Sequence, residues 1–140
     1  MNETRFSIHI HTHYSDGNAS HTELVKIAAK AGLNGIITTD HNIWLDGLDG
    51  YYGEGKHKVM LLVGEEIHDR KLEPPGNHLL AINAGKEMAM YADSPQRLID
   101  QIQRSDGLSF LAHPIEDPLE MFNEKEFSWR DWDIHGFTGI

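Results

Sequence analysis

The chain has 140 residues, enough for one domain with a buried core. Its 12 basic and 22 acidic residues give a formal net charge of −10 at pH 7, which disfavours binding to nucleic acid. It has no cysteine, so disulfides and thiolate metal sites are excluded. No apolar run approaches the length of a membrane span and the N-terminus lacks a signal-peptide pattern. We therefore expect a cytoplasmic protein with no membrane partner.

The first predicted strand covers residues 5–11, where apolar and polar residues alternate. His9 and His11 stand two residues apart, so we expect both side chains on the same face of the strand. Two neighbouring imidazoles are a good start for a transition-metal site. A turn signal follows at residues 14–17 and would bring the carboxylate of Asp16 back over the end of the strand.

A helix and a second strand come next in the prediction. The helix begins after Ser20, which starts a capping-box pattern, and it ends at Gly32. The β-branched run at 35–39 suits a buried strand and ends just before Asp40 and His41. A strand–helix–strand unit of this kind implies that its two strands are parallel.

Three further strands are predicted over residues 58–63, 78–82 and 108–112. The first of them is expected to end at Gly64. A second helix begins after Ser94, with a proline at its first position.

An imidazole or a carboxylate lies in or beside each predicted strand. In parallel α/β sheets and barrels, ligands bind at the carboxyl ends of the strands, so these side chains are expected to converge on one pocket. His78 precedes its apolar run, and it would join the others if its strand runs antiparallel or if the site extends to the first residue of that strand. The candidates are His9, His11, His41, Glu66, His78 and His113.

These segments resemble, in order, the motifs of the PHP (polymerase and histidinol phosphatase) superfamily, with Glu66 in the ligand position of the glutamate motif. The resemblance implies an α/β fold, namely a distorted, TIM-like, seven-stranded β/α barrel. Here the barrel is expected to be incomplete, with about five strands, in a single partial domain over residues 1–140. The segments that carry the resemblance are 9–17, 37–41, 63–67, 77–80 and 111–114.

The resemblance also implies up to three divalent metal ions. Imidazole and carboxylate ligands suit zinc, manganese or iron. Asp40 is a candidate catalytic residue that would orient a group or accept a proton, or it would anchor a neighbouring ligand. His9, His11 and Glu66 would serve one ion, Glu66 would bridge to a second ion held with His78 and His113, and Asp16 and His41 would serve a third.

The activity implied by the resemblance is metal-dependent hydrolysis of a phosphoester in a small phosphorylated metabolite or nucleotide. The metals would clamp the phosphoryl oxygens and generate hydroxide from a bridging water. One alternative is an inactive metal-binding fragment or assembly module. Another is an amidohydrolase-type enzyme that acts on a C–N bond. That class usually relies on a lysine in a middle strand, and no lysine here ends an apolar strand at that place.

The late Asp-x-His motif of the family has one counterpart in spacing, formed by Asp133 and His135. This pair lies only 20 residues after His113 and precedes residues 137–140, which look like the beginning of the family's next strand. We therefore expect a family member cut short at its C-terminus. An unclosed barrel has an open edge, through which we expect self-association.

Several other polar residues are assigned to the surface or to supporting roles. His57 and His68 are predicted to be solvated, and Glu65 is predicted to be a turn residue or a support for a ligand. A solvated face is also favoured for the basic residues that could bind phosphate, which are Arg5, Arg70, Lys71 and Arg97.

Overall fold

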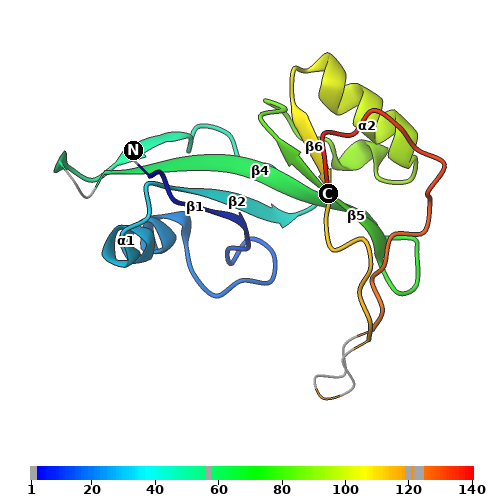
Figure 1. The fold of residues 1–140 in the computed structure, drawn as a ribbon, viewed down its shortest axis with the longest axis horizontal. Coiled ribbons are helices and arrows are strands. Elements are labelled where there is room, and N and C mark those ends of the chain that lie inside the picture. Colours follow the sequence, from blue (N-terminus) through cyan, green and yellow to red (C-terminus); the bar gives the residue numbers. More distant parts are fainter. Residues whose placement is uncertain (1–2, 56–57, 119–120, 122–124) are drawn as a thin grey trace.

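The computed structural model describes residues 3–55, 58–118, 121 and 125–140. Within these ranges, six strands form one mixed sheet (Figure 1). The elements in chain order are β1 (Phe6–Ile10), α1 (His21–Ala31), β2 (Gly35–His41), β3 (Gly50–Tyr52), β4 (Val59–Asp69), β5 (Gly76–Ile82), η2 (Ala89–Tyr91), α2 (Pro95–Arg104) and β6 (Leu108–Leu111).

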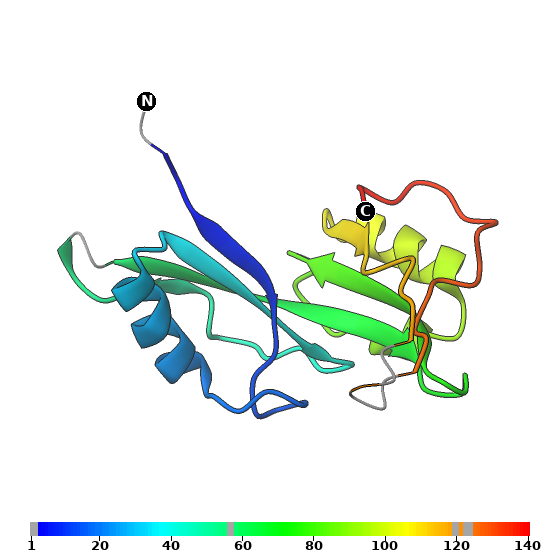
Figure 2. The same cartoon turned by 60° about the horizontal axis from the view of Figure 1, so that its bottom comes forward.

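The sheet follows the order β1-β2-β4-β5-β6, and the short β3 pairs separately with β4. Strands β1, β2 and β4 are parallel, whereas β5 runs antiparallel to both β4 and β6. The sheet curls into a half-barrel with α1 and α2 packed against its two ends (Figures 1 and 2). This confirms the expected incomplete barrel. Because β5 is reversed, its first residues share an edge with the last residues of β1, β2 and β6.

Helix α1 has the predicted bounds because both of its ends are capped. Ser20 Oγ accepts a hydrogen bond from the backbone N–H of Glu23, whose carboxylate accepts one from the backbone N–H of Ser20. Gly32 ends the helix in a left-handed conformation with φ 74°. The helix buries Val25 and Ala28 against the first core cluster, whose other buried members are Ile36, Val59 and Leu61.

Helix α2 covers the other end of the sheet. It begins with Pro95 after Ser94, as predicted, and buries three apolar side chains along one face. Those side chains join the second core cluster, made of Ile67, Leu79, Ala81, Met88, Leu98, Ile99, Ile102, Leu111 and Trp129. The two clusters share no member, and strand β4 contributes buried residues to both.

Strand β4 is longer than predicted, and its expected end at Gly64 is wrong. A Cβ at Gly64 would lie 2.7 Å from the carbonyl oxygen of Ala81, so glycine here allows β5 to approach closely. The strand continues to Asp69, and in its register His41 of β2 pairs with Glu66. Glu66 is therefore held inside the sheet and does not lie in a loop.

The two edges of the sheet differ. At one edge, β1 exposes Phe6 and Ile8 by 43% and 53%. At the other edge, Gly139 forms a parallel bridge with Phe110 of β6. The self-association predicted for an open edge stays a prediction. Across the described ranges, no helix combines the length and apolar character that a membrane crossing requires.

Candidate metal centre

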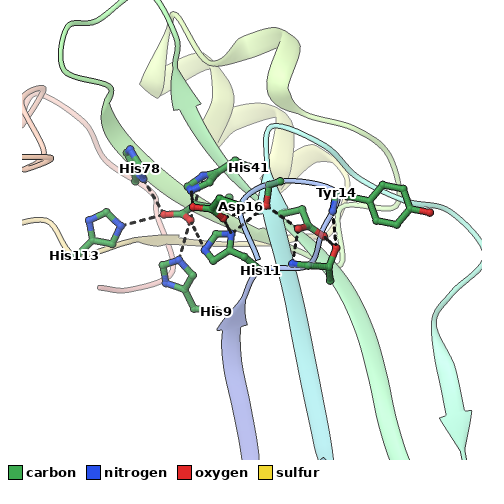
Figure 3. A network of polar contacts seen from close by, with 11 residues as sticks. His9, His11, Tyr14, Asp16, His41, His78 and His113 are labelled. Atoms are coloured by element: carbon green, nitrogen blue, oxygen red, sulfur yellow. Dashed lines mark hydrogen bonds and ion pairs between the residues drawn. The ribbon is translucent and has the colours of Figure 1, made fainter. Parts of the chain in front are cut away.

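A cavity of about 830 Å³ lies where β1, β2 and β6 end and β5 begins. Its wall brings together every metal ligand that the sequence predicted, although these residues come from distant parts of the chain (Figure 3). They are His9, His11, Asp16, His41, Glu66, His78 and His113.

The carboxylate of Glu66 stands at the centre of this arrangement, with its side chain only 1% exposed. Its Oε2 atom lies 2.8 Å from Nε2 of His9 and 3.1 Å from Nε2 of His11. Nδ1 of His41 lies 3.4 Å from the same oxygen. Three imidazoles, two at the end of β1 and one at the end of β2, thus face one carboxylate oxygen.

The other oxygen of Glu66 faces the opposite part of the sheet. Oε1 lies 2.9 Å from Nδ1 of His78 and 3.1 Å from Nε2 of His113. The second ring nitrogen of His113 lies 2.9 Å from Oε2 of Glu116, a contact that orients the ring. Glu66 therefore belongs to two groups of candidate ligands at once, which is the position that the resemblance predicts for it.

Asp16 defines a third group near the mouth of the cavity, where its side chain is 67% exposed. Its two carboxylate oxygens lie 3.4 Å from Nδ1 of His11 and 3.6 Å from Nε2 of His41. The sequence predicted only Asp16 and His41 for this third group, and the structure adds His11. In each of the three groups, the candidate ligand atoms all lie within 4.8 Å of one another.

These separations fit a metal centre. Two ligand atoms on one tetrahedral ion, each about 2.0–2.1 Å from it, are roughly 3.3 Å apart. The nitrogen-to-oxygen separations around Glu66 and Asp16 range from 2.8 to 3.6 Å. The donor set contains imidazole and carboxylate and no thiolate, which suits zinc, manganese or iron. The ligand roles of the seven residues stay predictions, which this convergence supports.

The charges of the site depend on this geometry. Burial alone would raise the pKa of Glu66, but the hydrogen bonds of the surrounding histidines outweigh it and lower that pKa well below its usual range. The hydrogen bond to Glu66 raises the pKa of His11 and of His113. Burial lowers the pKa of His41, which favours the neutral imidazole that binds metal ions.

His9 and His11 lie close together, as predicted, but not because of a regular alternation along β1. His9 has φ 64° and the pairing of β1 with β2 shifts register between Ser7 and Ile10, so the simple alternation along the strand is broken. The two rings nevertheless lie with their centroids 5.1 Å apart. Gly17 closes the turn against this strand end, because a Cβ there would lie only 2.1 Å from the carbonyl oxygen of His11.

Asp40 has the geometry of an anchor. Its carboxylate is buried and accepts three hydrogen bonds of 2.7 Å, from the backbone N–H and hydroxyl of Thr12 and from the hydroxyl of Ser15. These contacts hold the segment that follows His11 against the end of β2. The catalytic role of Asp40 stays a prediction, and the observed contacts favour the anchoring alternative.

His68 corrects one expectation. It was predicted to be solvated, but its side chain is half-buried and lines the cavity. Burial lowers its pKa to about 4. The missed signal is the continuation of β4: once the strand is known to pass through Glu66, a residue two positions later is expected on the same face. His57, the other histidine predicted to be solvated, lies outside the described residues.

Other candidates lie elsewhere. Asp133 and His135 are exposed, and the backbone of His135 is bonded to Gln96 of α2, away from the described cavity wall. The cation that lines the described cavity is Lys125. Four other basic residues could bind phosphate according to the sequence, but none of them is part of the described cavity wall. They are Arg5, Arg70, Lys71 and Arg97.

Comparison with known proteins identifies the family. The model of the PHP domain family matches residues 7–130, which is most of the chain. The chain belongs to the PHP domain family. An uncharacterized protein of Methanocaldococcus jannaschii, MJ1587, is 26% identical over 140 residues, covering 92% of this PHP domain and 77% of that protein.

Two solved structures share the fold of this PHP domain. One is a two-domain protein of Bacteroides vulgatus that contains a predicted PHP-like metal-dependent phosphoesterase, with 20% identity and a TM-score of 0.53. The other is the lesion-specific endonuclease PfuEndoQ of Pyrococcus furiosus, with 17% identity and a TM-score of 0.51. Each match covers 79% of this chain. The chain spans about a third of each solved protein, namely 35% of the first and 34% of the second.

Proposed function

We propose that this PHP domain is a metal-dependent phosphoesterase that acts on a small phosphorylated metabolite or nucleotide. The observation that carries the proposal is the buried Glu66 carboxylate with five imidazoles 2.8–3.4 Å from its two oxygens. A single carboxylate shared by two groups of candidate ligands can bridge a pair of neighbouring ions. Family membership favours a phosphoesterase over an amidohydrolase.

Each part of the centre has a distinct task in this proposal. His9, His11 and Glu66 would hold one ion, and Glu66 with His78 and His113 would hold a second. When bound, the ions would polarise the phosphoryl oxygens and lower the pKa of water at the site. Glu116 orients the ring of His113 through their 2.9 Å contact. The histidines of the centre must be neutral to act as ligands, so binding of the ions releases protons.

The cavity has features that suit a small phosphorylated substrate. Its volume of about 830 Å³ is within the range of small-molecule pockets, which is about 300–1,000 Å³. Lys125 lines it and carries a charge that complements a phosphate group, while Pro75 and Phe127 supply an apolar surface for the rest of the substrate. In this structure the ammonium group of Lys125 is paired with Glu73, so a bound phosphate would compete with that carboxylate.

One alternative substrate follows from the similarity to an endonuclease. A nucleic-acid strand would have to approach a chain with a net charge of −10, which opposes its binding. The proposal therefore keeps a small substrate, and a short single-stranded DNA serves as the competing substrate in the test. An inactive metal-binding domain is the second alternative, and it predicts ion binding without turnover.

The test measures hydrolysis of p-nitrophenyl phosphate by the purified chain with added manganese or zinc. We expect metal-stimulated phosphate release that falls at least 100-fold in Glu66→Gln, because that variant loses a charge shared by two groups. His13→Asn is the matched control, because His13 is exposed and does not line the cavity. Bound metal without hydrolysis would leave the inactive alternative, and cleavage of the DNA alone would overturn the small-substrate proposal.

A further inference from the structure

We propose that His68 is a metal ligand and that, together with His41 and His78, it forms a further position for a divalent transition-metal ion. This inference rests on the proposed function, since the position lies in the same centre. It adds a residue that the resemblance did not assign and that the sequence pattern placed in solvent.

The geometry of the three rings carries the inference. Each ring offers a nitrogen, and these three atoms all lie within 4.8 Å of one another. The ring centroid of His68 lies 4.7 Å from that of His78 and 5.0 Å from that of His41, and the remaining pair is 5.5 Å apart. Three imidazoles from β4, β5 and the end of β2 thus surround one small space, a donor set that suits zinc, iron, nickel or copper.

The same rings carry buried polar atoms that lack partners. Nδ1 of His68 and Nε2 of His78 are shielded from solvent and have no hydrogen-bond partner among the described residues. Nδ1 of His41 is shielded as well, and it makes no hydrogen bond although Oε2 of Glu66 lies 3.4 Å away. A buried nitrogen without a partner is destabilising, and a coordinated ion is one way to satisfy it. The two nitrogens of His68 and His78, on rings that converge with that of His41, point to one shared ligand.

The position of His68 is fixed by the backbone and is not that of a free surface side chain. Asn42, which follows His41, has φ 52° and donates a backbone hydrogen bond of 2.9 Å to the carbonyl oxygen of Glu66. Its side-chain oxygen accepts a hydrogen bond of 3.1 Å from the backbone N–H of His68. This contact between the ends of β2 and β4 sets the distance between His41 and His68.

The new position shares residues with the groups already described. Nε2 of His41 faces Asp16, and both Nδ1 of His41 and Nδ1 of His78 face Glu66. A neutral imidazole has one lone pair for a metal, so an ion beside His68 would compete for His41 and for His78 with ions in those groups. The centre is therefore expected to hold fewer ions than it has candidate groups.

The decisive experiment uses His68→Cys with cobalt(II). The natural chain contains no cysteine, so a thiolate-to-cobalt charge-transfer absorption in the near ultraviolet would arise only from the introduced side chain. We expect that absorption in His68→Cys and expect none in the matched control His13→Cys, whose site is exposed and outside the cavity wall. A folded His68→Cys protein that binds cobalt without this absorption would overturn the inference and leave the proposed function intact.

A second variant covers the case in which the cysteine disturbs folding. His68→Phe keeps an aromatic ring in the place where His68 now stacks on His78, with an angle of 17° between the ring planes, but it has no nitrogen to bind an ion. We expect cobalt affinity for at least one position to fall about 10-fold or more. An unchanged cobalt titration would refute a ligand role for His68. A parent chain that binds no cobalt would overturn the inference and the proposed function together.

Discussion

Glu65 and Glu66 are neighbours in β4 and yet their pKa values shift in opposite directions. The strand turns Glu66 toward the histidines, whereas Glu65 points to the other face, where its Oε2 accepts a hydrogen bond from the backbone N–H of Met88. Glu65 is 1% exposed, and burial raises its pKa from 4.5 to about 7. The substitution Glu65→Gln tests this difference, because it keeps the acceptor oxygen and removes the titration.

The expected effect follows from the two pKa values. Between pH 4.5 and about 7 the folded chain retains a proton on Glu65 that the unfolded chain releases, so stability falls as the pH rises through that window. The full difference corresponds to roughly 3 kcal/mol, since each pH unit contributes about 1.4 kcal/mol. Glu65→Gln removes this loss. The variant should have a stability close to that of the parent at pH 4 and should gain roughly 3 kcal/mol relative to it at pH 8.

The assay is urea unfolding of both proteins at pH 4, 6 and 8, with a chelator present throughout. Histidine titrations occur in both proteins and cancel in the difference between them. Glu54→Gln is the control for the substitution itself, because that glutamate is exposed. A difference for Glu65→Gln that stays constant between pH 4 and pH 8 would refute the argument from burial.

Three further substitutions separate the centre from its supports. Glu66→Gln should weaken zinc binding at least 100-fold, or roughly 2.8 kcal/mol, in a competition titration with a chelating dye. Asp40→Asn should lower the free energy of unfolding by roughly 1–3 kcal/mol, because an amide cannot accept all three hydrogen bonds from Thr12 and Ser15; an unchanged urea midpoint would contradict this. Ser20→Ala should lose about 1 kcal/mol with its helix cap and bind zinc normally, and a loss of zinc affinity would argue against its purely structural role.

Much of the framework could be predicted from local sequence patterns. The first helix is bounded by the cap at Ser20 and by Gly32, and both signals act within a few residues. A reversed β5 is one of the two arrangements that the sequence predicts for bringing His78 to the other ligands, and the antiparallel pairing of β4 with β5 shows that it occurs. The convergence of strand ends followed from general rules of α/β folds.

The remaining features depend on contacts between distant segments. Gly64 is a turn signal in isolation, but in the sheet it lets β5 pass close by, and β4 therefore continues. That continuation is what places His68 in the cavity. The left-handed backbone of His9 and the three hydrogen bonds to Asp40 likewise arise from the packing of the segment after β1 against β2. No periodicity in the sequence encodes them.

The two separate core clusters have a consequence for ion binding. Ligands on β1 and β2 belong to the part that contains α1, ligands on β5 and β6 belong to the part that contains α2, and β4 passes through both. An ion that contacts both sets would cross-link two parts that share no buried apolar cluster in the described structure. Ion binding and a motion that separates the two parts are thermodynamically linked. Such a motion lowers the affinity for the ion by the same factor by which the bound ion reduces the population of the separated state. A cavity-forming substitution such as Ile99→Ala, within the second core cluster, would lower the stability of the part that carries His78 and His113, and bound ions would offset some of that loss because they bind the folded state.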